Sequence, residues 1–317
     1  MTRWAVVLAG GVGSRFWPVS TPERPKQLLP LATSEPLLAD ALTRLAPIVP
    51  VERTLVLTNA GLVDGIAALA PTLPRENLIA EPRPAGTAAA LAWGAHVIAQ
   101  RGSRDDVMIS VHADWAIGDP DGFRKALLDA AETAESQHAL VTVGIVPVRP
   151  DPGFGYIQPG EPAGPHARRV VRFVEKPDRA RADAMVRDGY LWNSGIFVWR
   201  AGDFLDEIAA LTPEIAPHLA AHPHDLAGFF GAVETPIAVD VGVMERSARV
   251  RCSAGTSAGT TWARGRRSGA CAHATSAATR CTVSCTRSSR RTTWSTPTGT
   301  PSSCTGYATS SSCRATA

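Results

Sequence analysis

The sequence of 317 residues has two parts, and each part lacks residue types that the other contains. Residues 1–246 contain no cysteine, and residues 247–317 contain no Asp or Glu. The first part carries a net charge of −7 and the second +10, so the whole-chain value of +3 does not argue for nucleic-acid binding. No apolar run approaches the ~18 residues of a membrane-spanning helix, so we expect no membrane segment. The run Trp4–Ala9 is too short for a signal peptide, which together with the missing cysteines predicts a cytoplasmic protein.

Short apolar runs alternate with helical patterns through the first part of the chain. The predicted strands are Trp4–Ala9, Thr54–Thr58, Val107–Val111 and Ala139–Ile145, and the predicted helices are Pro36–Leu45, Thr87–Gln100 and Phe123–Glu135. This alternation predicts an α/β fold, with a mainly parallel sheet and helices on both faces. Ligands bind beyond the carboxyl ends of such strands, so we expect functional residues directly after Ala9 and Val111.

After Pro147 the elements become shorter. The predicted strands are Gly153–Pro159, Arg168–Val174 and Gly195–Trp199, and the predicted helices are Asp178–Asp188 and Ala201–Leu211. This pattern predicts a smaller mixed-sheet lobe within one continuous domain.

A glycine-rich segment follows the first predicted strand. Gly10, Gly11 and Gly13 let backbone N–H groups approach an anion, and Arg15 and Lys26 add positive charge for phosphates. A dinucleotide-binding loop is excluded because Phe16 stands where a third glycine is required, and Ser14-Arg15-Phe16 excludes a Walker A loop. The alternative is a glycine turn without a ligand, but the two basic residues favour phosphate binding.

Asp114 follows the predicted strand Val107–Val111. A carboxylate at this position suits a hard cation such as Mg²⁺, which would also contact phosphate oxygens. The alternative is an Asp that caps the following turn. His112 is interpreted as a packed polar residue rather than a ligand.

The segment Leu8–Pro18, followed by Pro25-Lys26-Gln27, resembles the signature of the sugar-1-phosphate nucleotidyltransferases. With Trp17 and Lys26-Gln27 it is most similar to the mannose-1-phosphate guanylyltransferases. Further segments resemble that family in the same order: Glu81–Ala89, His112–Asp114, Gly153–Ile157, Phe173–Pro177, Trp192–Phe197 and Asp240–Glu245. Gly86 departs from the family, which usually has Asn there.

The resemblance implies a Rossmann-like, GT-A-like sheet with a sugar-binding lobe, and transfer of GMP from GTP to mannose 1-phosphate with Mg²⁺. It implies these roles: Arg15 and Lys26 catalytic; Gly10, Gly11, Gly13, Ser14, Glu81 and Thr87 for the nucleotide; Gly155, Glu175, Lys176 and Asn193 for the sugar phosphate; Asp114 for the metal. Each sugar-site residue also has a purely structural alternative. Glu175 and Lys176 could form a surface ion pair, Asn193 could be a turn residue, and Gly155 could form a β-bulge.

Two other functions stay open from the sequence. One is another sugar nucleotidyltransferase that uses UTP or dTTP, and the other is a non-catalytic protein that binds sugar nucleotides. The partners expected are the two substrates, with no nucleic acid and no membrane, and homo-oligomerisation is left open.

Residues 247–317 lack Leu, Ile, Phe and Met, so we predict a disordered low-complexity tail after a nucleotidyltransferase domain at 1–246. The family's next motif, Gly-Asp-Phe-Gly-Trp-Asp-Asp-Val-Gly-Thr-Trp, holds a metal-binding Asp and is absent here. Codons for residues 251–265 can nevertheless be chosen so that a second reading frame encodes this motif. We therefore hypothesise that the chain from about Arg251 is translated in a shifted frame. A zinc site among the cysteines and a nucleic-acid arm are weaker interpretations, because the cysteine spacing fits no familiar site and lysine is absent.

Overall fold

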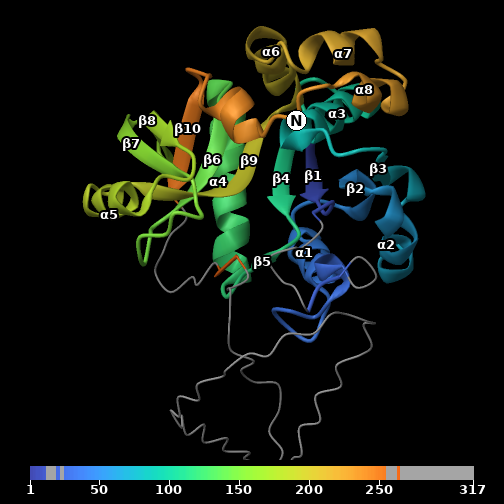
Figure 1. The fold of residues 1–317 in the computed structure, drawn as a ribbon, viewed down its shortest axis with the longest axis horizontal. Coiled ribbons are helices and arrows are strands. Elements are labelled where there is room, and N and C mark those ends of the chain that lie inside the picture. The colour runs from blue at the N-terminus through green and yellow to red at the C-terminus, as the bar shows by residue number, and fades with distance from the viewer. Residues whose placement is uncertain (12–18, 22–24, 255–262, 265–317) are drawn as a thin grey trace, which may run out of the picture. The chain divides into compact units, whose positions relative to one another are not determined.

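The computed structural model describes residues 1–11, 19–21, 25–254 and 263–264. Its centre is a nine-stranded sheet in the order β3-β2-β1-β4-β9-β6-β10-β8-β7 (Figure 1). The strands of the sheet are β1 (Arg3–Leu8), β2 (Thr54–Asn59), β3 (Leu78–Glu81), β4 (Val107–His112), β6 (Leu140–Ile145), β7 (Tyr156–Pro162), β8 (Ala167–Val174), β9 (Leu191–Arg200) and β10 (Val250–Ala254). A separate short pair joins β5 (Trp115–Ala116) to β11 (Ala263–Arg264).

Helices cover both faces of this sheet. They are α1 (Leu37–Leu45), α2 (Val63–Leu69), α3 (Gly86–Arg101), α4 (Pro120–Gln137), α5 (Arg179–Arg187), α6 (Ala201–Leu211), α7 (Ala216–Ala221) and α8 (Leu226–Ala232). Alternate residues of β1 enter different cores: Ala5 and Val7 pack with α1 and α4, whereas Trp4 and Val6 pack with α3, α6 and α8. Because side chains alternate along a strand, one buried strand serves both layers.

The first four strands run parallel. The sequence predicts β1, β2 and β4 in a mainly parallel sheet, whereas β3 and the helix α2 were not predicted. The predicted strands and helices of this part reappear with ends shifted by no more than a few residues. All the strands that carry expected phosphate or metal residues therefore end at one edge of the sheet.

Strand β9 is longer and more central than predicted. It runs antiparallel between β4 and β6, with Ser110 opposite Phe197 and Gly144 opposite Asn193. The sequence assigned only Gly195–Trp199 to a strand of the smaller lobe. In the structure the strand also includes Leu191–Ser194. Because β9 is antiparallel to β4 and β6, its amino-terminal residues lie where those strands end, and this places Asn193 at that edge.

The sheet continues beyond residue 246, where the composition changes. Strand β10 pairs in parallel with β6 and antiparallel with β8. Val250 and Cys252 are buried, and burial raises the pKa of the Cys252 thiol to about 11. A composition averaged over residues 247–317 conceals this five-residue strand, and the remaining tail lies outside the described residues apart from β11.

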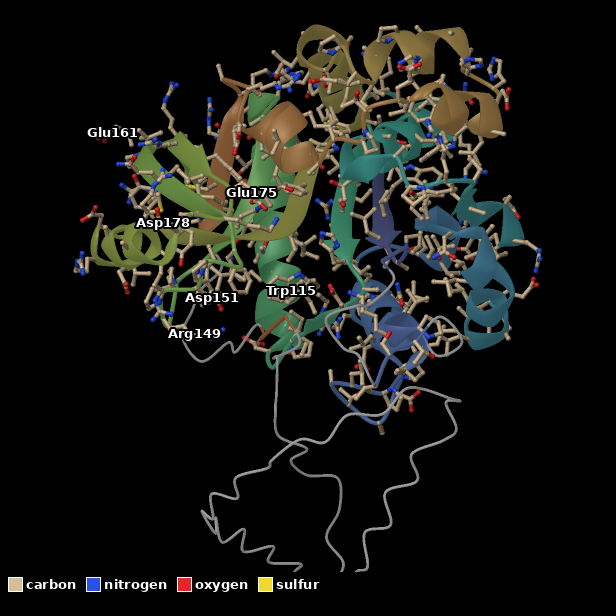
Figure 2. The ribbon with its side chains drawn as sticks, in the orientation of Figure 1. Trp115, Arg149, Asp151, Glu161, Glu175 and Asp178 are labelled. Carbon is tan, nitrogen blue, oxygen red and sulfur yellow. The ribbon has the colours of Figure 1, made fainter. Side chains whose placement is uncertain are left out.

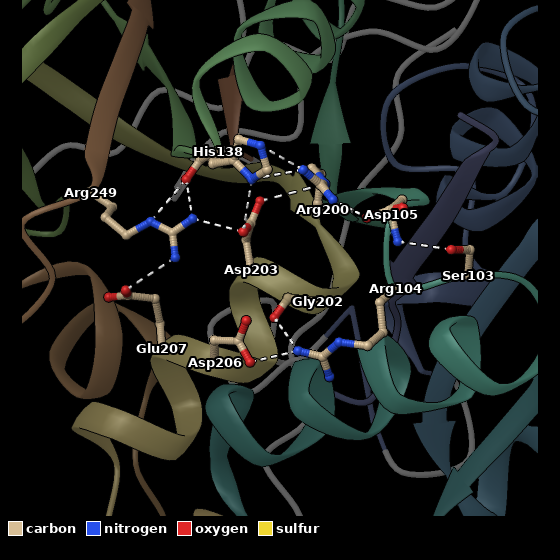
Figure 3. Close-up of polar contacts among 10 residues, drawn as sticks. All are labelled: Ser103, Arg104, Asp105, His138, Arg200, Gly202, Asp203, Asp206, Glu207 and Arg249. Atoms are coloured by element: carbon tan, nitrogen blue, oxygen red, sulfur yellow. Dashed lines mark hydrogen bonds and ion pairs between the residues drawn. The ribbon is translucent and has the colours of Figure 1, made fainter.

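A polar network holds the start of β10 at the opposite edge of the sheet (Figure 3). Arg249 donates to the carboxylate of Asp203 at 2.7 Å and to the carbonyl oxygen of His138 at 2.9 Å. Arg200 lies 2.7 Å from the His138 ring and also pairs with Asp105. The network joins α6, β9 and the end of α4, so it fixes the approach of the chain to β10.

Among the residues that the structure describes, no helix has the length and apolar character needed to cross a membrane.

Candidate active site

Lys26, Asp114 and Gly11 meet at the carboxyl edge of β1 and β4. Lys26 Nζ donates to Asp114 Oδ2 at 2.6 Å, and a Cβ added to Gly11 would lie 3.8 Å from the same Nζ. Both charged side chains are largely enclosed, at 15% and 8% exposure. The glycine turn and the two charges thus share one place, whereas Gly13, Ser14 and Arg15 lie outside the described residues.

Gln27 fixes the shape of the turn after β1. Its buried amide donates to the carbonyl oxygens of Ala9 at 2.7 Å and Gly11 at 2.6 Å. Asn59, at the end of β2, donates to the Gly10 carbonyl at 3.2 Å. These bonds hold the three successive carbonyl groups of residues 9–11 in place. Sequence reasoning quoted Gln27 in the motif Pro25-Lys26-Gln27 but gave it no role.

Glu81 ends β3 beside the same turn. Its Oε1 lies 3.6 Å from the position of a Cβ on Gly10. Burial raises the pKa of Glu81 to about 7, so near neutrality its carboxyl group can either donate or accept a hydrogen bond.

Gly86 and Thr87 open α3 and contact the segment that precedes Asp240. Gly86 has a φ of +84°, and a Cβ there would lie 2.3 Å from the Ile237 carbonyl oxygen. The Ala88 N–H donates to that oxygen at 3.1 Å, and the Val239 N–H donates to the Thr87 hydroxyl at 2.9 Å. This close approach explains why glycine stands at position 86, since no side chain fits between α3 and Ile237.

Gly155, Glu175 and Asn193 form a second cluster. A Cβ on Gly155 would lie 2.6 Å from Glu175 Oε2 and 3.4 Å from Asn193 Cβ, and the Asn193 N–H donates to the Gly155 carbonyl at 2.8 Å. In Figure 2, Glu175 lies over the central strands, whereas Glu161 and Asp178 lie toward the outer edge. A side chain at position 155 would therefore displace the Glu175 carboxylate from its place.

Lys176 is exposed and pairs with the carboxylate of Glu175. Its φ of +43° is in the left-handed region, which is uncommon for a residue other than glycine. Such strain costs of order 1 kcal/mol and concentrates at functional sites, which agrees with a role for this turn in binding.

The two clusters are neighbours because β4 and β9 are paired. A Cβ on Gly195, two residues after Asn193, would lie 3.0 Å from His112 Nε2, and His112 is two residues before Asp114. The predicted phosphate, metal and sugar residues that the structure describes are therefore gathered along one edge of the sheet.

Asp240 is a member of the second cluster that sequence reasoning did not select. It begins a π-helical turn (Asp240–Met244) and accepts a hydrogen bond from Asn193 Nδ2 at 2.6 Å. Burial and then the negative charge of Glu175 raise the pKa of Asp240 to about 6. The nearby Glu245 also has a raised pKa, mainly from burial. The only sequence signal was its position at the start of the family-like segment Asp240–Glu245.

The sequence predicts Asp114 as the residue that holds a divalent cation, and its carboxylate lies beside the glycine turn and Lys26. The described residues contain no group of three or more His, Cys, Asp or Glu side chains arranged to hold a metal. One carboxylate fits Mg²⁺ nonetheless, because Mg²⁺ is commonly bound by one or two carboxylates together with substrate phosphates. The Lys26 ammonium at 2.6 Å indicates that Asp114 favours a positive charge beside it.

Comparison with known proteins assigns the chain to a family. Residues 4–230 match the family model described as Nucleotidyl transferase. The chain belongs to this family. Mannose-1-phosphate guanylyltransferases from Klebsiella pneumoniae and Escherichia coli strain K12 are 37% and 39% identical to it over 258 and 265 residues. Each alignment covers 77% of this chain and 54% of the relative, so the chain spans about half the length of these relatives.

A solved structure from Thermus thermophilus, described as a mannose-1-phosphate geranyltransferase, is also similar. It has a TM-score of 0.75 and 34% sequence identity, covering 83% of this chain and 76% of that one. The mixed α/β architecture with its mostly parallel sheet is thus shared with this solved structure.

Proposed function

We propose that this chain transfers GMP from GTP to mannose 1-phosphate, with GDP-mannose and pyrophosphate as products. The observation that carries the proposal is the meeting of Lys26, Asp114 and Gly11 at the sheet edge that also holds Gly155, Glu175 and Asn193. The names of the similar proteins supply the substrates for this proposal.

The reaction needs charge compensation rather than a general base. A phosphate oxygen of mannose 1-phosphate attacks the α-phosphorus of GTP, a new P–O bond forms, and the bond to the β-phosphate breaks as pyrophosphate leaves. The nucleophile is already an anion, so the obstacle is repulsion between phosphates and the charge that builds on the leaving group. Lys26 beside the glycine turn would offset charge on the nucleotide, and Lys176 would offset charge on the sugar phosphate.

Asp114 would hold Mg²⁺ together with phosphate oxygens of the nucleotide. When bound, the ion supplies positive charge at the triphosphate. Lys26 would donate to a phosphate oxygen of the nucleotide, because its ammonium group lies beside both Asp114 and the glycine turn.

The test is a pyrophosphate-release assay on the full chain with Mg²⁺, mannose 1-phosphate and each of GTP, UTP and dTTP. Release with GTP supports the proposal. Release only with UTP or dTTP, or only with another sugar phosphate, would replace it by a different sugar nucleotidyltransferase. Binding of GDP-mannose without turnover would indicate the non-catalytic protein instead. The cytoplasmic location, the homo-oligomer and the absence of nucleic-acid and membrane partners stay predictions.

A further inference from the structure

The side chain of Asn193 is almost fully engaged inside the protein. Its Oδ1 accepts hydrogen bonds from the Thr142 hydroxyl at 3.0 Å and the Gly195 N–H at 3.1 Å. Its Nδ2 donates to Asp240 at 2.6 Å, and the residue is 9% exposed. An amide offers two acceptor positions and two N–H groups, so a single N–H remains. A contact to neighbouring hydroxyl groups of a sugar, with one donor and one acceptor, is therefore beyond its capacity.

Asp240 has the acceptor capacity that Asn193 lacks. An ionised carboxylate accepts about four hydrogen bonds, and Asn193 is the only other residue among those described that donates one to the Asp240 side chain. The carboxylate is partly buried and lies near Glu175, which makes its negative charge costly. Hydroxyl groups that donate to it would reduce this cost.

The position of Asp240 is fixed from two sides. From the sugar-side cluster, Asn193 holds Oδ1. From the nucleotide side, the Thr87 hydroxyl holds the N–H of the preceding residue Val239, and Ala88 holds the Ile237 carbonyl. The segment 237–240 thus connects the start of α3 with the second cluster, and a displacement at either end would move the carboxylate.

We propose, on the basis of the proposed function, that Asp240 is the residue that accepts a hydroxyl group of the sugar phosphate, and that Asn193 is a positioning residue that orients Asp240. The charged groups that face Asp240 are Glu175 and Lys176 from the end of β8, and Glu245 follows the same π-helical turn. Lys176 can reach the phosphate, while Glu175 and Asp240 present acceptors to the sugar ring. The specificity for a hydroxylated sugar then resides in a pair of carboxylates.

The matched variant is Asp240→Asn. Asn193 already donates toward Oδ1, so the new amide would turn its oxygen to Asn193 and its NH₂ group to the place of Oδ2. An acceptor becomes a donor with almost no change in shape. We expect KM for mannose 1-phosphate to rise ~10-fold, because the hydroxyl group loses a charged acceptor and meets a neutral amide in its place, with KM for GTP changed less than about 2-fold. Glu234→Gln, which changes an exposed carboxylate outside the cluster, is the control, and it should leave both KM values unchanged.

Deoxy substrates separate a contact from a structural role. With a mannose 1-phosphate that lacks the contacted hydroxyl group, Asp240→Asn and the unaltered chain should have equal kcat/KM. A merely structural role would reduce kcat/KM for every substrate alike. Asn193→Ala should raise KM for the sugar phosphate, and the double variant should be no worse than Asp240→Asn, because both changes act through one carboxylate.

The outcomes distinguish the inference from the function on which it rests. If the unaltered chain turns over and Asp240→Asn keeps the normal KM, or loses activity equally with all deoxy substrates, the assignment of Asp240 is wrong and the proposed function stands. If the unaltered chain shows no turnover, calorimetry with GDP-mannose replaces kinetics, and a weaker binding by Asp240→Asn supports the assignment. If the unaltered chain neither reacts with nor binds GDP-mannose, both proposals fail.

Discussion

Gly86→Ala tests whether α3 and the segment before Asp240 need to approach as closely as they do. Two costs are expected. An alanine at a φ of +84° costs about 1 kcal/mol relative to glycine. Its Cβ would also lie 2.3 Å from the Ile237 carbonyl oxygen, so that segment would have to move away.

This movement would break two hydrogen bonds, from Ala88 to Ile237 and from Val239 to Thr87. Each is worth about 1 kcal/mol net, so the total loss is expected to be about 3 kcal/mol. The matched control is Gly189→Ala. Gly189 has a φ of +78° with no neighbour within 4 Å of the new Cβ, so this variant carries the backbone cost of about 1 kcal/mol alone.

Urea unfolding followed by circular dichroism measures both losses, and the difference between them isolates the clash. Kinetics adds an independent readout. Gly86→Ala should also raise KM for mannose 1-phosphate because Asp240 moves with its segment, whereas Gly189→Ala should not. Equal stability losses in the two variants, with normal KM in both, would refute the reasoning.

Further results are expected from four other variants. Lys26→Ala or Asp114→Asn should lower turnover by about 10²-fold or more with the circular dichroism spectrum unchanged, and a purified variant with the normal rate would remove that residue from the mechanism. The raised pKa of Glu81 means that its contribution to stability is present below the unfolded value of 4.5 and is lost as the pH rises toward about 7. Glu81→Gln should therefore be more stable than the unaltered chain by about 2 kcal/mol near pH 8, and no more stable near pH 4, in urea unfolding at both values. Asp203→Ala removes the nearer of the two carboxylates that Arg249 contacts and leaves Glu207 at 3.5 Å, so it should cost about 2 kcal/mol in the same assay; a loss under about 1 kcal/mol would show that Glu207 and solvent replace the contact.

The central strands could be predicted because their sequences report burial on both faces. Val107–Val111 is apolar at every position except Ser110, and the structure extends the strand by one residue to His112. Strand β9 was only half predicted because Asn193 and Ser194 interrupt its apolar pattern. Both are nevertheless buried, Asn193 through its bonds to Thr142 and Asp240 and Ser194 through a bond to the Val143 carbonyl at 2.6 Å. Buried polar residues in β9 thus interrupt the apolar pattern by which the strand would be predicted from the sequence.

Most members of the candidate site could be named from the sequence, but neither their partners nor Asp240 could. Lys26 and Asp114 are 88 positions apart, and Asn193 and Asp240 are 47 apart. Only the order of the strands brings them together. Asp240 was not predicted because its role depends on the hydrogen bonds that already engage the Asn193 side chain. Those bonds exist only in the folded structure and cannot be inferred from either segment alone.

Strand β10 lies where the frame-shift hypothesis places the change of reading frame, so the hypothesis has to explain why this strand still forms. Backbone hydrogen bonds pair residues 250–254 with β6 and β8 whatever their side chains, and a shifted frame needs only small or apolar residues at the buried positions. Cys252 and Ser253 meet that condition, so the strand can form even when translated in the wrong frame. The change would then remove the acidic motif that the resemblance implies after β10 while leaving the sheet intact. A chain with the frame restored should accordingly release pyrophosphate much faster than this one at equal stability, and a gene whose single intact frame encodes residues 251–317 would end the hypothesis.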